Sequence, residues 1–284
     1  MAEGVTLAGE NALTLMEPLT KLAVEAGVAI LAINRNTMGL GKKIDGSVVS
    51  DADNLADAII AKGLAKLAPN IPVLSEERTH LAARPYRDSF FLIDPLDGTR
   101  EFVTGTDEFT VNIALVTCGE PVLGIVVAPA LGTVWRGIIG IGAERLLVTK
   151  DATVYGAPTP IRTRPHPAPG APWVVSVSRS HGDPRTEAFI AERPGSIRQV
   201  LGSAIKFCRV AEGGADIYPR LSPTSEWDVA AGHAIVTAAG GLVTSGLGEL
   251  LKFGEAREDF LVRDFIAWGD RQAASLGKSQ TPGQ

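Results

Sequence analysis

The sequence predicts an α/β (α+β) protein in which layers of helix and sheet stack over one site at their junction. Three observations support this. Apolar residues recur at helical spacing in much of the first 70 residues, β-branched and aromatic runs fill residues 89–140, and helix-like and strand-like segments alternate from residue 173 onward. Helices first, then an antiparallel sheet, then an α/β half is the order expected of such stacked layers.

The helical pattern is clearest in two segments near the N-terminus. Residues 15–36 carry apolar side chains at a period that buries one face of a long helix. Residues 53–68 repeat the pattern, and Asp53 or Asn54 is placed to cap that helix. Both helices are expected to pack on the sheet that follows them.

The sheet is predicted as an antiparallel meander. Short connectors with Gly or Pro separate its apolar, β-rich runs, which are residues 89–93, 109–117, 121–129 and 132–140. A Pro-rich polar stretch at 157–172 then connects to the second half. That half is expected to contain strands at 173–179, 197–201 and 216–221, with helices near 184–192, from about 203, and at 228–240.

These elements predict a domain organisation. Residues 1–155 would form an N-terminal α+β subdomain with the antiparallel sheet and most of the acidic motifs. Residues 156–277 would form a C-terminal α/β subdomain, and residues 278–284 a disordered tail. The chain has 284 residues, of which 45% are hydrophobic and 21% charged, so it can bury a substantial core.

Composition excludes several classes of protein. The formal net charge is −5, and the sequence contains no run of basic residues of the kind that binds a phosphate backbone. A nucleic-acid polymer is therefore not an expected partner. No apolar stretch reaches the length of a membrane span and no signal peptide pattern is present, which favours a cytoplasmic protein. Cys118 and Cys208 lack metal-ligand spacing and are interpreted as reduced core residues.

Acidic residues stand out where elements begin or end. The stretch 92-LIDPLDGTREF-102 places Asp94 and Asp97 around a proline directly after an apolar run. Three further motifs are similar: Glu76 and Glu77 after a short strand, Asp51 and Asp53 at a helix start, and Asp228 in the first turn of a small-residue helix. Taken singly, each is explained by a turn, a cap or a solvated loop.

Convergence of these carboxylates would point to a metal. Several carboxylates within a few ångströms repel one another unless a cation neutralises them. Oxygen ligands without His or Cys favour Mg²⁺ over zinc, and Mg²⁺ is commonly bound by a few carboxylates together with a substrate phosphate. Gly98 and Thr99 would then offer backbone N–H groups to an anion at a helix start.

The combination of 75-SEE-77, 94-DPLDGT-99 and 227-WDVAAG-232 with 50-SDAD-53 resembles the lithium-sensitive, Mg²⁺-dependent phosphatase superfamily that includes inositol monophosphatase. The resemblance implies a five-layered α-β-α-β-α sandwich and two or three Mg²⁺ ions. It implies metal ligands at Glu76, Asp94, the Leu96 carbonyl, Asp97 and Asp228. By the same resemblance Thr99 and Asp53 would orient and deprotonate the attacking water, Glu76 would act near a third, water-held ion, and the Gly98 and Thr99 amides would hold the phosphate.

Finer motifs are similar to one branch of that superfamily, the 3'(2'),5'-bisphosphate nucleotidases of the bacterial CysQ type. They include 97-DGTREF-102, 178-SRSH-181, 202-GSAIKFC-208 and 213-GGADIYPRL-221. This resemblance implies hydrolysis of the 3'-phosphate of adenosine 3',5'-bisphosphate in sulfur assimilation, with Ser203, Lys206 and Arg220 as substrate-binding residues. Arg100 and Ala204 depart from the usual Lys and Ser of the branch, but neither is a metal ligand.

The chemistry of Arg220 favours the same branch. A guanidinium accepts no hydrogen bond and forks onto phosphate or carboxylate, and Lys206 would add a second cation, so a substrate with two phosphates fits. Arg220 could instead pair with a surface acid. The alternatives are a phosphatase for inositol, sugar or histidinol phosphates, or a nucleotide-binding sensor without turnover. The resemblance allows a monomer or a homodimer and implies inhibition by lithium.

Overall fold

The computed structural model describes residues 2–42, 48–81, 88–149, 156–255 and 260–276. Two helices, α1 (Ala2–Ala32) and α2 (Asp51–Leu67), pack side by side on one face of a large sheet. The predicted cap of α2 was wrong. Ser50 is the N-cap, and its hydroxyl accepts a 3.2 Å hydrogen bond from the Ala52 N–H, while Asp53 is the third helical residue.

The large sheet has seven strands in the order β3-β4-β5-β6-β7-β8-β9. Their bounds are β3 (Val73–Ser75), β4 (Ser89–Asp97), β5 (Thr110–Thr117), β6 (Glu120–Ala128), β7 (Thr133–Ile138), β8 (Gly142–Leu147) and β9 (Thr159–Ile161). Only the β3–β4 pair is parallel, so the predicted antiparallel meander is confirmed. Strand β9 lies beyond residue 155, and the division into subdomains stays a prediction.

A middle layer of two helices, α5 (Ile205–Ala211) and α6 (Glu226–Ala238), covers the other face of this sheet. Small residues allow the close approach. A Cβ on Gly124 of β6 would lie 2.2 Å from the Ala231 carbonyl oxygen, and one on Gly232 would lie 2.4 Å from the Phe207 ring. Glycine is therefore required at both contacts. Cys208 is buried in this layer, but Cys118 lies in the exposed β5–β6 turn, so its predicted core position was wrong.

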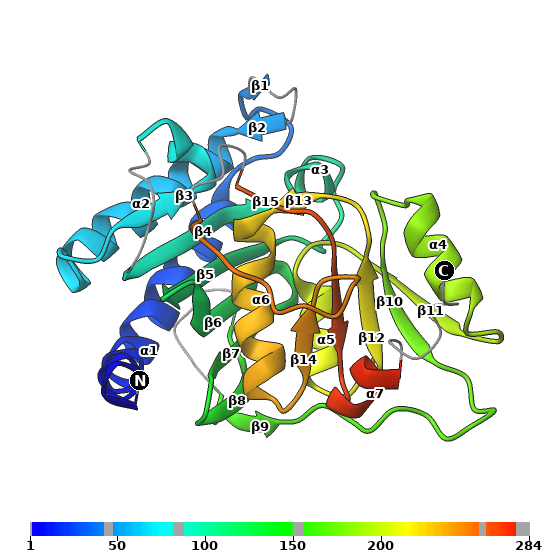
Figure 1. Cartoon of the computed structure of the whole chain (residues 1–284). Coiled ribbons are helices and arrows are strands. Elements are labelled where there is room, and N and C mark those ends of the chain that lie inside the picture. Colours follow the sequence, from blue (N-terminus) through cyan, green and yellow to red (C-terminus); the bar gives the residue numbers. More distant parts are fainter. Residues whose placement is uncertain (1, 43–47, 82–87, 150–155, 256–259, 277–284) are drawn as a thin grey trace.

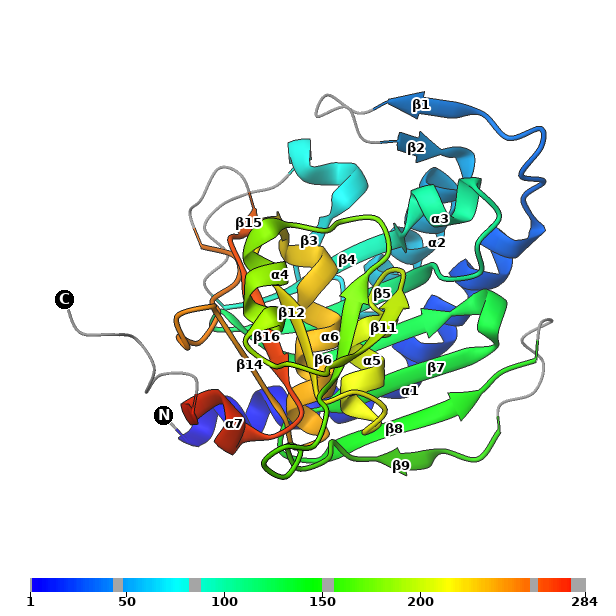
Figure 2. The same ribbon diagram turned by 90° about the vertical axis from the view of Figure 1, so that its right-hand side faces the viewer.

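A second sheet of five strands packs on the far side of α5 and α6, in the order β11-β10-β12-β16-β14. Its strands are β10 (Val174–Ser178), β11 (Ile197–Leu201), β12 (Ile217–Arg220), β14 (Leu242–Thr244) and β16 (Phe265–Trp268). Figure 2 is turned so that the side of the molecule with this sheet and α4 (Pro184–Ala191) faces the viewer. The sequence reading missed β14, β16 and the last helix, α7 (Arg271–Leu276), because each is short.

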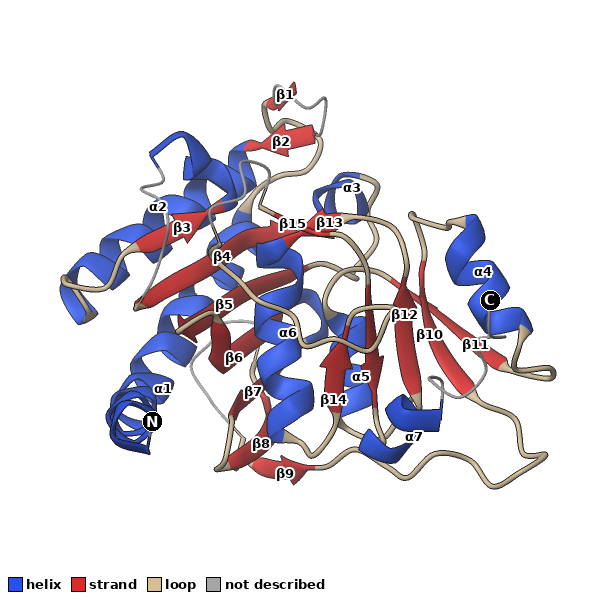
Figure 3. Ribbon diagram, viewed as in Figure 1, coloured by secondary structure: helices blue, strands red, loops and turns tan. Residues whose placement is uncertain are grey.

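The layers run across the molecule in the order helix, sheet, helix, sheet, helix (Figure 1). Figure 3 shows the same alternation by type of element, with α4 and α7 outside the second sheet. The five-layered α-β-α-β-α sandwich is thereby confirmed. Short elements complete the chain: β1 (Leu40–Lys42), β2 (Val48–Ser50), α3 (Thr99–Val103), β13 (Thr224–Ser225), β15 (Leu261–Val262) and the 3-10 turns η1 (Glu76–Leu81) and η2 (Pro129–Leu131). The predicted tail lies outside the described residues.

Candidate active site

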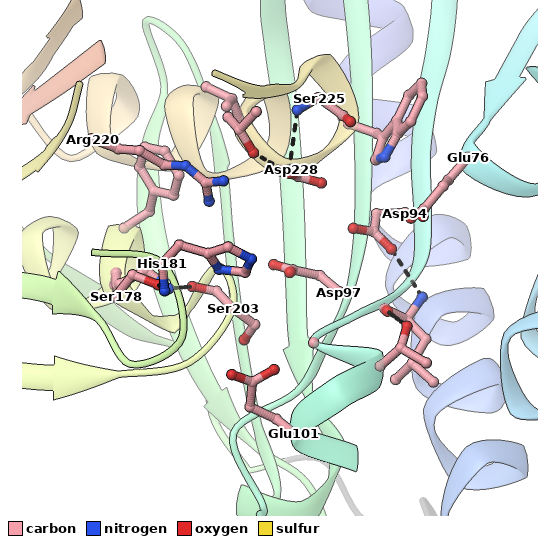
Figure 4. Close-up of a pocket in the computed structure, with 18 of the residues that line it drawn as sticks. Glu76, Asp94, Asp97, Glu101, Ser178, His181, Ser203, Arg220, Ser225 and Asp228 are labelled. Atoms are coloured by element: carbon pink, nitrogen blue, oxygen red, sulfur yellow. Dashed lines mark hydrogen bonds between the residues drawn. The ribbon is translucent and has the colours of Figure 1, made fainter. Parts of the chain in front are cut away.

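A pocket of about 750 Å³ opens where the two halves of the chain meet, between the end of β4 and the middle layer. Figure 4 shows carboxylates and a guanidinium entering it from several elements. Its lining contains every predicted site residue except Asp53: Glu76, Asp94, Leu96, Asp97, Gly98, Thr99, Ser203, Lys206, Arg220 and Asp228. A volume of this size accommodates a drug-sized or nucleotide-sized ligand.

The end of strand β4 supplies the centre of the acidic side. The β4–β5 register shifts between Asp94 and Asp97, with Pro95 between them, because proline cannot donate to the ladder. Asp94 is buried, and its Oδ1 accepts a 3.0 Å hydrogen bond from the Leu96 N–H. Gly98 follows with φ of 91°, a left-handed conformation that turns the chain into α3.

Asp53 lies behind Thr99 and contacts it directly. The Thr99 hydroxyl donates a 2.8 Å hydrogen bond to Asp53 Oδ1. The other carboxylate oxygen of Asp53 accepts from the Ser50 N–H at 2.7 Å and the Ser50 hydroxyl at 2.6 Å. Asp53 is only 1% exposed, so its carboxylate contacts Thr99 and is shielded from solvent. The predicted pair is brought together, and Ser50 orients it.

Asp97 and Asp228 lie near each other on the same side of the pocket (Figure 4). Asp228 is the third residue of α6 and accepts hydrogen bonds from the Thr224 hydroxyl and, at 3.3 Å, from the Ser225 N–H. Burial and then the negative charge of Asp228 raise the pKa of Asp97 to about 7, against the opposing effect of Lys206. A buried carboxyl whose ionisation a neighbouring negative charge opposes is a suitable environment for a cation.

The donor set fits a hard divalent ion in its chemistry. Glu76 enters from η1, and with Asp94, Asp97 and Asp228 it gives four carboxylates on one side of the pocket, without a cysteine among the lining residues. As they stand, however, no three Asp, Glu, His or Cys side chains of the described residues are arranged to hold a single ion.

Lys206 and Ser203 form the floor of the opposite side. Lys206 is 3% exposed, and its Nζ donates to the Ser203 carbonyl at 2.5 Å and lies 5.3 Å from the Tyr218 ring centroid. Burial lowers the pKa of Lys206 to about 8, although the charge of Asp97 opposes this shift. Ser203 has φ of 45°, and its buried hydroxyl has no hydrogen-bond partner. Lys206 therefore holds the turn that carries a free hydroxyl.

Arg220 reaches into the same side from β12. One Nη2 donates to the Pro223 carbonyl at 3.3 Å, and the buried Nε has no partner. No carboxylate of the described residues lies within 4 Å of Arg220. Arg220 therefore does not form, with these residues, the surface ion pair that was the alternative to substrate binding. His181 points toward the same space (Figure 4), and burial followed by the charge of Arg220 lowers its pKa.

Glu101 and Tyr218 are among the lining residues that were not predicted. Glu101 is a buried carboxylate of α3 that accepts a 2.5 Å hydrogen bond from the Ser180 hydroxyl, and Tyr218 is a buried ring of β12. The charge of Glu101 within an otherwise apolar stretch, 101-EFV-103, was the available signal. For Tyr218 the sequence offers none, because a tyrosine in a strand is ordinary core material.

The five-layered fold and the carboxylate-lined pocket indicate a phosphatase, and comparison with known proteins identifies its family. The model of the inositol monophosphatase family matches residues 15–279, so the chain belongs to this family. The resemblance stated from the motifs is confirmed.

Curated relatives narrow the position within the family. The chain is 38% identical over 256 residues to the 3'(2'),5'-bisphosphate nucleotidase CysQ of Shigella flexneri, covering 87% of this chain and 96% of the relative. It is 40% identical over 251 residues to the enzyme of that name from Salmonella typhimurium, with the same coverage. A crystal structure of CysQ from Bacteroides thetaiotaomicron matches with a TM-score of 0.69 and 32% identity, over 92% of this chain and 98% of that one.

Proposed function

We propose that the chain is a Mg²⁺-dependent phosphomonoesterase that removes the 3'-phosphate of adenosine 3',5'-bisphosphate, giving AMP and phosphate. The observation that carries the proposal is the composition of the pocket. One side is lined by carboxylates that include Glu76, Asp94, Asp97 and Asp228. The other side offers Arg220 Nε and Ser203 Oγ, both buried without a partner among the described residues. The names of the CysQ relatives support the same substrate class. Sulfur assimilation is the process in which we place it.

The acidic side would hold the metal ions. We assign Glu76, Asp94, the Leu96 carbonyl, Asp97 and Asp228 as ligands for two or three Mg²⁺ ions. Bound there, the ions supply the Lewis acid that lowers the pKa of water and stabilises charge on the transferred phosphoryl group. The pocket residues fit this role because they bring several negative charges together with oxygen donors alone.

Asp53 and Thr99 would handle the proton of the attacking water. Asp53 Oδ1 accepts the hydroxyl proton of Thr99, which leaves the Thr99 oxygen free to accept a hydrogen from water. Because Ser50 holds the other oxygen of Asp53, the carboxylate cannot turn away. The Gly98 and Thr99 amides would bind the phosphate that is released, in an in-line displacement without a covalent intermediate.

The opposite side would bind the phosphate that is kept. Arg220 and Ser203 offer an N–H and an O–H that the chain leaves unpaired, which an anion can satisfy. Lys206 adds positive charge and holds the Ser203 turn through the carbonyl of that residue. A substrate with one phosphate would leave these buried groups unpaired, and this is the physical basis for a preference for bisphosphates.

Location and assembly remain predictions beside this function. No helix in the described part of the chain is both long and apolar enough to span a bilayer. We also propose a cytoplasmic location, assembly as a monomer or a homodimer, and inhibition by lithium.

The test measures phosphate release with Mg²⁺ from adenosine 3',5'-bisphosphate, inositol 1-phosphate and fructose 1,6-bisphosphate in parallel. We expect fast release from the nucleotide and loss of about 10³-fold or more in Asp94→Asn, because a central charge of the site disappears. Asp107→Asn is the matched control, since Asp107 is 63% exposed and pairs only loosely with Arg35 at 3.6 Å. Preference for inositol phosphate would overturn the assignment of substrate. No phosphate release from any of the three substrates would favour the alternative of a nucleotide-binding sensor without turnover.

A further inference from the structure

Glu108 lies between the two sides of the pocket, in the connection from α3 to β5. Its carbonyl oxygen approaches a glycine on each side. A Cβ on Gly98 would lie 3.2 Å from this oxygen, and a Cβ on Gly202 would lie 2.5 Å from it. Gly98 begins the turn that leads to Thr99, and Gly202 directly precedes Ser203. Glu108 therefore lies between two turns. One leads to Thr99 on the acidic side of the pocket, and the other carries Ser203 on the basic side, which also contains Lys206 and Arg220.

The Glu108 side chain binds the basic side as well. Its carboxylate accepts hydrogen bonds from the Gly202 N–H at 2.7 Å and from Arg179 at 3.0 Å through Nε and 2.9 Å through Nη2. The same Nη2 of Arg179 also donates to the Val200 carbonyl at 3.1 Å. The forked pair thus ties strand β11 and the Gly202 turn, both of the second half, to a loop of the first half.

A second contact reinforces this connection. The Ser180 hydroxyl donates a 2.5 Å hydrogen bond to Glu101, on the helix that follows Gly98. Ser180 neighbours Arg179, and the flanking residues Ser178 and His181 line the pocket. The loop of residues 178–181 is consequently held to the first half at two successive positions, and it forms part of the pocket wall.

We propose that Glu108, paired with Arg179, is a positioning residue that sets the distance between the two anion-binding sides of the pocket. The inference rests on the proposed function and deepens it, since it assigns the preference for two phosphates to their spacing as well as to Arg220. Glu108 does not line the pocket, so it acts through Gly98 and Gly202. Displacing one phosphate site by a fraction of an ångström impairs only a substrate that must occupy both sites at once.

A surface ion pair with a purely structural role is the competing explanation. Glu108 and Arg179 side chains are 19% and 44% exposed, and pairs of that exposure add little to stability. Such a pair would affect all substrates equally. The two explanations therefore differ in the ratio of activities toward adenosine 3',5'-bisphosphate and adenosine 3'-monophosphate, which lacks the second phosphate.

The experiment compares kcat and KM for these two nucleotides, with Mg²⁺, in the wild-type chain, Glu108→Gln and Arg179→Met. Glu108→Gln keeps the size of the side chain and an acceptor for the Gly202 N–H but loses the charge. We expect kcat/KM for the bisphosphate to fall about tenfold in both variants, through KM, while kcat/KM for the monophosphate stays within about twofold. If one variant fails to fold, the other still gives the ratio.

The matched control is Glu187→Gln. Glu187 forms an equally forked pair with Arg198, at 2.9 Å and 2.7 Å, but both residues belong to the second half of the chain. This variant should leave the ratio unchanged. An unchanged ratio in Glu108→Gln and Arg179→Met overturns the positioning role while the proposed function stands. A wild-type chain without preference for the bisphosphate overturns the proposed function, and the positioning role with it.

Discussion

The two sides of the pocket differ in how far the chain satisfies its own polar groups. On the acidic side Asp53, Asp94, Asp97 and Asp228 each accept a hydrogen bond from a neighbouring hydroxyl, amide or backbone N–H. On the basic side the Ser203 hydroxyl and Arg220 Nε are buried without a partner. The acidic side is oriented by the chain, whereas the basic side leaves groups for a ligand to pair.

This difference separates two kinds of contribution. Oriented carboxylates that hold Mg²⁺ would act on the reacting phosphate of every ester that reaches them, so we expect the acidic side to set the rate. Unpaired buried donors are costly without a ligand, so we expect the basic side to set which substrate binds well. Changes on the acidic side should therefore lower kcat for all substrates, and changes on the basic side should alter the preference among substrates.

Thr99→Ala should produce the largest effect of the substitutions that separate the two sides. It removes the hydroxyl that Asp53 orients, so kcat should fall about 10²- to 10³-fold for bisphosphate and monophosphate alike, within the usual range for a lost proton-transfer group. Initial rates at saturating substrate provide the measurement.

Two further variants make this test specific. Thr99→Ser keeps the hydroxyl and should retain most of the activity. Thr104→Ala removes a hydroxyl that follows the same short helix and bonds only to the Arg100 and Glu101 carbonyls, so it should change little. A Thr99→Ala effect limited to the bisphosphate would contradict the assignment of Thr99 to the acidic side.

Arg220→Met should have a smaller and more selective effect. Loss of one buried charge partner of a phosphate costs at least about 2 kcal/mol, which is about 30-fold in kcat/KM for the bisphosphate. The monophosphate should be affected by less than about threefold, because it does not require that charge. Steady-state kinetics with both nucleotides give the comparison, with Arg198→Met on strand β11 of the same sheet as the control. An equal loss for both nucleotides would mean that Arg220 serves the acidic side.

The acidic side could be predicted from sequence because short motifs carry it. Asp94 and Asp97 occupy one strand end, and Asp228 a helix start, so their display follows from local rules. The role of Ser50 as the cap of α2 was missed, because Asp53 and Asn54 are equally good capping residues and only the backbone dihedrals of Ser50 decide. The five layers followed from the resemblance and the order of elements.

The basic side was predicted only in part, for a physical reason. Ser203, Lys206 and Arg220 lie on different elements, and the sequence names them without showing that Lys206 bonds to the Ser203 carbonyl. Contacts between the halves, such as Glu108 with Arg179, span 71 residues and follow no periodicity. Long-range pairs of this kind depend on how the layers stack, which local propensity does not determine.

Ser203→Ala should have the smallest effect and is the sharpest test of the difference between the sides. The hydroxyl has no partner among the residues that the structure describes, so its removal should change the free energy of unfolding by less than about 1 kcal/mol. An increase in stability is expected, because an unpaired buried group is lost. KM for the bisphosphate should nevertheless rise about tenfold, the effect of one hydrogen bond to a charged ligand in its lower range. Denaturant unfolding and KM are measured on the same preparation. A marked loss of stability would mean that the hydroxyl already has a hydrogen-bond partner. The polar groups of the basic side would then be paired within the protein, as those of the acidic side are.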